Sequence, residues 1–158
     1  MLFAFLTAFA VIMLRLVLLT LGHPPHATGF MLVHLLAIST VIFISGYRTL
    51  QADRSASVPM LLRTNFRSAA VYALCMAIFL WCYFKWAEPH HFQQRIDALV
   101  WKGVAEGQPE LVIRPRMEAF FTPFNYSTIT LAGLLIAGAM LTLLAAVFQH
   151  KVLRRLKP

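Results

Sequence analysis

An aromatic, apolar run near the middle of the chain changes abruptly into residues that could bind a metal ion. In the stretch FLWCYFKWAEPHHFQQRID, residues 79–97, the polar side chains include Glu88, His90 and His91, and a second polar segment, HPPHATG, holds His23 and His26. Imidazoles and a carboxylate suit Zn²⁺, Cu²⁺ or Ni²⁺. Adjacent histidines on a helix point about 100° apart, however, so His90 and His91 can hardly bind one ion. The spacing favours interfacial histidines over a metal site, and we expect no cofactor.

Arg15 and His34 are polar residues inside otherwise apolar runs. An arginine at the centre of a membrane helix costs at least about 2.5–3.5 kcal/mol, and the apolar runs contain no Asp or Glu. Counted from Gly22 and Thr28, both residues would lie about 10 Å below the same surface in an antiparallel helix pair. They could form a pocket for a lipid headgroup, a small anion or a partner's carboxylate. The favoured alternative is that Arg15 snorkels to the outer headgroups while His34 bonds a neighbouring helix.

The composition indicates a membrane protein. The 158 residues are 59% hydrophobic and 13% charged, whereas soluble domains are about 25% charged. A membrane helix needs about 20 apolar residues, and four runs meet this length, at about 2–22, 28–47, 66–86 and 126–148. Since backbone groups in lipid must bond internally, we predict an all-α integral membrane protein, with residues 1–158 forming one four-helix domain.

The basic residues predict the orientation of the chain. The linker between the second and third runs and the C-terminal tail together carry eight basic residues and one acid, whereas the connection from Lys85 to Phe124 carries five of each. The positive-inside rule then places both termini in the cytoplasm. The net charge of +8 is accordingly explained by contacts with anionic headgroups, not by nucleic acid binding.

The outer segment, about residues 89–122, is expected to lie at the membrane surface. Glu88-Pro89 resembles a helix start, and apolar residues then recur at helical spacing until Glu106-Gly107. A second short helix is expected around residues 116–121, after Pro115. We favour a helix lying in the interface, anchored by Lys85, Trp86 and Trp101, over one that caps the bundle or docks on a partner.

The last run contains small residues at spacings that allow helices to approach closely. Gly133 and Ala137 share one helical face, and Gly138 shares another with Thr142. Such faces serve packing inside the protein's own bundle, or contact with a second copy or another membrane protein. The sequence leaves both alternatives open.

The order of these segments resembles a known family. A basic linker precedes WCYFKW, Glu88-Pro89, an amphipathic helix, FFTPF and the small-residue run LAGLLIAGAM. This order is similar to an uncharacterised family of small bacterial four-helix inner-membrane proteins, a domain of unknown function, most clearly from Tyr47 onward. The resemblance implies a fold and a location but no catalytic residues. Family members are often encoded near glycosyltransferases that act on lipid-linked sugars, which implies a role in envelope lipid or glycan metabolism.

Several functional classes fit the sequence poorly. His34 has no histidine opposite it for haem ligation, and the apolar runs lack the carboxylates typical of proton-driven transporters. Our leading hypothesis is a non-enzymatic accessory protein that binds another membrane protein or itself. The competing hypothesis is a small membrane enzyme or lipid- or anion-binding carrier that uses Arg15 and His34.

Overall fold

The described part of the protein consists of helices joined by short connections and contains no strand. This computed structural model describes residues 1–23 and 27–153, so His26 and the basic residues of the C-terminal tail after Leu153 lie outside the described residues. Short π-helical segments continue two of the helices, at Tyr83–Ala87 and Gln149–Leu153. The α-helices are α1 (Leu2–Thr20), α2 (Ala27–Ala52), α3 (Val58–Cys82), α4 (His91–Ala105), α5 (Glu110–Phe120) and α6 (Pro123–Phe148).

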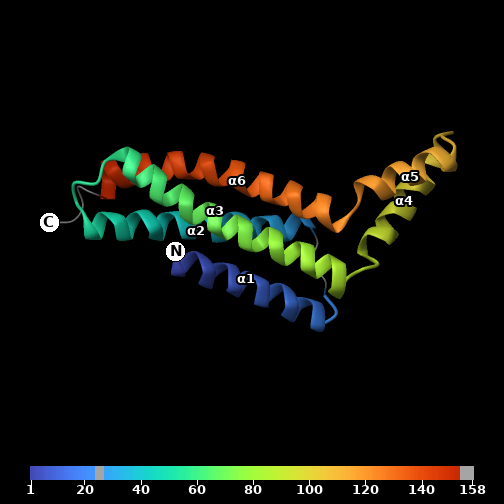
Figure 1. The fold of residues 1–158 in the computed structure, drawn as a ribbon, viewed down its shortest axis with the longest axis horizontal. Helices are drawn as coiled ribbons and strands as arrows, with labels where there is room; N and C mark the ends of the chain where they lie inside the picture. The colour runs from blue at the N-terminus through green and yellow to red at the C-terminus, as the bar shows by residue number, and fades with distance from the viewer. Residues whose placement is uncertain (24–26, 154–158) are drawn as a thin grey trace. The chain divides into compact units, whose positions relative to one another are not determined.

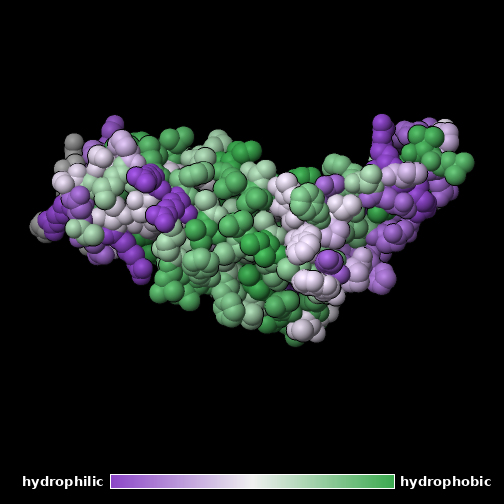
Figure 2. All heavy atoms as spheres, viewed as in Figure 1, coloured by the Kyte–Doolittle hydropathy of each residue, from purple (hydrophilic) through white to green (hydrophobic). Residues whose placement is uncertain are grey.

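Four of the helices are long and apolar enough to cross a membrane. They are α1, α2, α3 with its π-helical extension, and α6 with its own extension. Large hydrophobic side chains remain exposed along all four, and Figure 2 shows hydrophobic residues over much of this surface. In a bilayer these side chains would contact lipid, whereas they would be unusual on a soluble protein. The prediction of a multi-pass, all-α membrane protein is therefore confirmed at this level.

The second and third spans are longer than predicted. We expected helices at about 28–47 and 66–86 with a basic linker between them, but α2 continues to Ala52 and α3 already begins at Val58. Arg48, Arg63 and Arg67 are consequently helical, and the connection shrinks to residues 53–57. Hydropathy marks where a chain leaves the lipid, but a helix that neighbouring helices support can continue beyond that point, and arginine is among the better helix formers.

The sequence predicts one domain, whereas the chain divides into two compact units. The first contains residues 1–76 and 131–158 in so far as they are described, and the second contains residues 77–130. In the first unit, α1 and α2 form an antiparallel pair. α1 ends because Gly22 adopts a φ of +73°, which lets the N–H groups of Gly22 and His23 bond the carbonyls of Leu19 and Leu18.

The second unit contains a hairpin of α4 and α5 (Figure 1). The apolar stripe predicted for α4 lies inside this unit, where Phe92, Ile96 and Val100 are buried. Gly103 lies so close to Ile113 of α5 that an added Cβ would overlap its side chain. At the turn, Gly107 has a φ of +88°, and its N–H bonds the carbonyl of Val104. The apolar stripe of α4, which we expected to face the headgroups, is thus largely covered by other parts of the protein.

Two boundaries of the outer segment differ from the prediction. α4 begins at His91, after a turn that contains Glu88 and Pro89. The short second helix, expected after Pro115, instead begins at Glu110 and contains Pro115. The expectation was wrong because Pro109 already provides the extended residue before the helix. Pro115 then removes only one backbone donor from a helix that also packs against α4.

Candidate functional site

Arg15 and His34 come together inside the first unit. Both side chains are buried, with exposed fractions of 6% and 7%. The Arg15 guanidinium carbon lies 5.1 Å from the centre of the Phe30 ring, and the His34 ring contacts the same ring edge-on at 5.2 Å. Because Phe30 precedes His34 by one helical turn, α2 presents both rings to Arg15 of α1. The two predicted residues therefore belong to one cluster.

Tyr72 of α3 completes this cluster. Its hydroxyl oxygen lies 2.9 Å from His34 Nδ1, and its side chain is fully buried. Which group donates the proton depends on the imidazole tautomer. Sequence reasoning missed both aromatic partners of His34. Phe30 could have been found from its four-residue spacing, whereas nothing in the sequence points to Tyr72.

The cluster combines a guanidinium, an imidazole and a phenol between three helices. These groups can recognise a carboxylate or a phosphate, and they can also hold helices together through aromatic and hydrogen-bonding contacts. The charged group of Arg15 is buried over a ring of α2, and the structure contains no bilayer that would test whether this arginine snorkels to the headgroups. Whether the cluster binds an anion or a lipid stays a prediction.

The predicted interfacial anchors lie in the second unit. The Lys85 ammonium nitrogen is 5.0 Å from the centre of the Trp81 ring and 5.7 Å from that of Trp86. Trp86 and Trp101 are exposed. A lysine that contacts two indoles is typical of residues that anchor a helix end in the headgroup region, although the structure contains no bilayer that would test this role.

The histidines do not form a metal site in the part of the chain that the structure describes. No group of three potential ligands occurs among residues 1–23 and 27–153. His91 Nδ1 lies 3.7 Å from a Glu88 oxygen, and His90 is exposed on the same segment. The His23 ring bonds the carbonyl of Leu21. His26 lies outside the described residues.

The small residues of α6 fall into two environments. Gly138 lies against Ala69 of α3 and Ile38 of α2, so its missing side chain allows close packing inside the first unit. Gly133 is exposed and has nothing within 4 Å of the position that a Cβ would occupy, and Ala137 is partly buried. Packing within the bundle accounts for Gly138 but leaves Gly133 available to a neighbour.

Arg114 links the two helices of the hairpin. Its guanidinium donates to Asp97 of α4 at 2.8 Å and to Glu110 of α5 at 2.9 Å. The hydrogen bond to Asp97, and then that to Glu110, raise the pKa of Arg114 above its ordinary range. The arginine thus stays charged throughout physiological pH, and it adds a polar connection to the apolar contacts of the hairpin.

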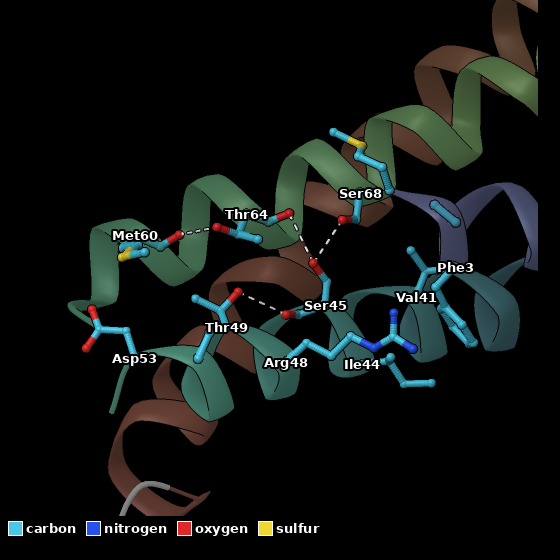
Figure 3. Close-up of a pocket in the computed structure, with 13 residues that line it drawn as sticks. Phe3, Val41, Ile44, Ser45, Arg48, Thr49, Asp53, Met60, Thr64 and Ser68 are labelled. Atoms are coloured by element: carbon cyan, nitrogen blue, oxygen red, sulfur yellow. Dashed lines mark hydrogen bonds between the residues drawn. The ribbon is translucent and has the colours of Figure 1, made fainter. Parts of the chain in front are cut away.

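A cavity that the sequence analysis missed lies where α1 and α3 begin and α2 ends (Figure 3). Its volume is about 350 Å³, and we call it the basic-end cavity because Arg48 lines it. Ser45, Thr49 and Asp53 line it as well. The signal in the sequence was Arg48 itself, which we assigned only to the positive-inside pattern.

Comparisons of the chain with family models, with curated proteins and with solved structures found no match. The resemblance to small four-helix membrane proteins therefore stays a prediction. Proposals about function depend on the geometry described above.

Proposed function

We propose that this chain is an accessory protein of a bacterial inner membrane that acts by binding another membrane protein. Four helices could span the membrane. Basic residues cluster where α2 ends and α3 begins, whereas acidic and basic residues balance in the second unit, and this difference favours cytoplasmic termini. The family resemblance suggests that the process is envelope lipid or glycan metabolism. The main structural support comes from the surface of the α4–α5 hairpin.

That support is a patch of large apolar side chains at the turn of the hairpin, outside the four spans. We call it the hairpin-tip patch. Its residues are all exposed, and the exposed fraction of Leu111 is 90%. None of them is among the buried residues of α4 and α5. Figure 2 shows hydrophobic residues among hydrophilic ones at this end of the hairpin. The patch consists of Trp101, Val104, Leu111 and Val112.

The surroundings of the patch favour a protein partner. Exposed Lys102, Glu106 and Glu110 alternate with the apolar residues, and the first two approach within 3.9 Å. Protein interfaces commonly combine an apolar centre rich in aromatic residues with such a mixed-charge rim. A helix bound to anionic lipid would instead carry mainly Lys and Arg beside its apolar face.

Affinity purification in mild detergent tests this proposal. We expect the wild-type protein to retain a partner, identified by mass spectrometry, and the double variant Leu111→Glu/Val112→Glu to lose it. Arg116→Glu, an exposed change on the same helix, is the matched control. All three proteins must accumulate equally in the membrane. The proposal fails if the wild type purifies without any partner or if the double variant retains the same one.

A second candidate function is binding of a lipid or anion, as carrier or enzyme, at Arg15 and His34. The supporting observation is that both side chains are buried around Phe30 between apolar spans. Arg15→Leu is then expected to lose a lipid that co-purifies with the wild type, while Arg116→Leu retains it. Equal lipid content in the two variants, measured by mass spectrometry, would exclude this function.

A further inference from the structure

Asn65 carries a buried hydrogen-bond acceptor that no described residue satisfies. Its side-chain nitrogen donates to Gln149 Oε1 at 2.9 Å, and the Gln149 nitrogen donates to the carbonyl of Phe43 at 3.1 Å. Because a carbonyl can only accept, Gln149 must turn its nitrogen toward Phe43 and its oxygen toward Asn65. Asn65 then has to offer its own nitrogen to Gln149. The other end of its amide, Oδ1, is buried and has no partner among residues 1–23 and 27–153.

Thr142 of α6 is a second buried residue of this kind. Its side chain is 2% exposed, and its hydroxyl oxygen, Oγ1, bonds none of the described residues. Thr49 and Thr64 instead donate to the carbonyl four positions earlier in their own helices, as Figure 3 shows. Threonine in a helix commonly makes this bond. The hydroxyl of Thr142 does not, so it is available to a group outside its own helix.

Asn65 and Thr142 lie at the same level of the contact between α3 and α6. Gly138 of α6 packs against Ala69 of α3, where an added Cβ would come within 3.1 Å of the alanine side chain. Four residues of helix, about 6 Å, lead from Gly138 to Thr142 on the same face. The same step in the same direction leads from Ala69 back to Asn65, because α3 and α6 are antiparallel (Figure 1). The bond from Asn65 to Gln149 closes the contact further along α6.

The surroundings of the two atoms suit a water molecule. Small side chains lie one helical turn away, namely Ala69, Gly138 and the fully buried Ala146, and none of them can donate or accept a hydrogen bond. An unpaired polar atom inside a membrane bundle is costly, since neither lipid nor apolar side chains can satisfy it. Buried waters typically bond about three polar groups that would otherwise lack a partner. A larger ligand is disfavoured by the close helix contact at Gly138.

We propose that a water molecule binds between α3 and α6, where it donates a hydrogen bond to Asn65 Oδ1 and accepts one from the Thr142 hydroxyl. A helix carbonyl keeps a second lone pair that can accept the remaining hydrogen of the water. The water thus adds a polar connection between two spans beside the direct Asn65–Gln149 bond. This site is separate from the Arg15–His34 cluster, and it depends on neither proposed function.

Solid-state NMR of the full-length protein in lipid bilayers tests this inference. The chain contains only one asparagine besides Asn65, namely Asn125, so isotope labelling of asparagine alone gives two carboxamide signals. The variant Asn125→Gln assigns them. A water-edited spectrum detects magnetisation that passes from water protons to nearby carbons, at mixing times too short for exchange of the amide protons. We expect transfer to the carboxamide carbon of Asn65, although this residue is fully buried.

Three variants connect the signal to the proposed site. Thr142→Val removes the hydroxyl with little change in shape, and we expect the transfer from water to Asn65 to be lost. Thr142→Ser keeps a hydroxyl and should retain the transfer. Thr40→Val is the matched control, because Thr40 is exposed on α2 and its hydroxyl bonds the carbonyl of Leu36 at 2.8 Å. The transfer to Asn65 should be unchanged in this control.

The wild-type spectrum decides first between the proposal and its alternatives. Absence of transfer to Asn65 would overturn the proposal, and a carboxamide shift in Thr142→Val would then assign a direct bond between the two side chains. Transfer that persists in Thr142→Val would show that water reaches Asn65 without Thr142, and would also overturn the site. If Thr142→Val does not fold, the wild type and Thr142→Ser remain, and loss of transfer in either one contradicts the proposal.

Discussion

Asn65 and Gln149 are separated by 84 positions in the sequence, yet their side chains share a buried hydrogen bond of 2.9 Å. Both are fully buried, Asn65 on α3 and Gln149 where α6 passes into its π-helical extension. The Gln149 amide also donates to the carbonyl of Phe43 on α2, at 3.1 Å. One glutamine thus connects three spans, and Gly46 lies directly beside its amide.

Loss of the Asn65–Gln149 bond should destabilise the first unit. In Asn65→Ala, the buried Gln149 oxygen loses its donor, which we expect to cost about 1–3 kcal/mol of unfolding free energy. Unfolding in mixed micelles, followed by circular dichroism, measures this loss. In a double-mutant cycle with Gln149→Ala, we expect a coupling energy of about 0.6–1.7 kcal/mol. Strictly additive effects would mean that the bond contributes nothing.

Gly46 should tolerate no side chain. A Cβ at this position would overlap the Gln149 amide, so Gly46→Ala must displace the glutamine, at an expected cost of about 1–3 kcal/mol. Gly133→Ala is the matched control on α6, because the corresponding position has open space. There the change should be neutral or stabilise by up to about 1 kcal/mol. Similar stability losses in both variants would contradict the packing described for Gly46.

Arg114 should hold α4 and α5 together. Because Arg114→Gln removes the donor to Asp97 and Glu110, we expect faster hydrogen exchange in α5. The effect should be modest, since exposed ion pairs contribute little and are screened by salt. Arg116→Gln is the control. Since hydrogen bonding raises the pKa of Arg114, its contribution is present below the ordinary arginine range and is lost only in strong alkali. A difference between wild type and Arg114→Gln that vanishes between pH 6 and 9 would contradict this assignment.

The proposed topology predicts which loops are accessible from outside the cell. In a background lacking Cys75 and Cys82, a membrane-impermeant maleimide should label Gln108→Cys in intact cells. Ser55→Cys, in the connection between α2 and α3, should be labelled only after the membrane is permeabilised. The opposite labelling pattern would reverse the orientation, and labelling of both positions in intact cells would contradict four spans.

The sequence predicted some details of the outer segment and missed others. The end of α4 was predictable because Gly107 and Pro109 leave few other conformations to the chain. The start of α5 was not, because Pro115 was read as a boundary although contacts with α4 and the Arg114 ion pairs support a helix on both sides of it. Local residue preferences define a helix end only when no tertiary contact opposes them.

By itself, the sequence determined the number of spans and the all-helical class, because a bilayer requires long apolar runs whose backbone groups bond within one segment. It also singled out Arg15 and His34, since polar residues inside such runs are rare. Only the tertiary structure brought Phe30 and Tyr72 to this pair, joined Asn65 to Gln149, and opened a cavity beside Arg48. The physical reason is that hydropathy is similar all around a membrane helix, so the face that each helix presents to its neighbours depends on side-chain packing.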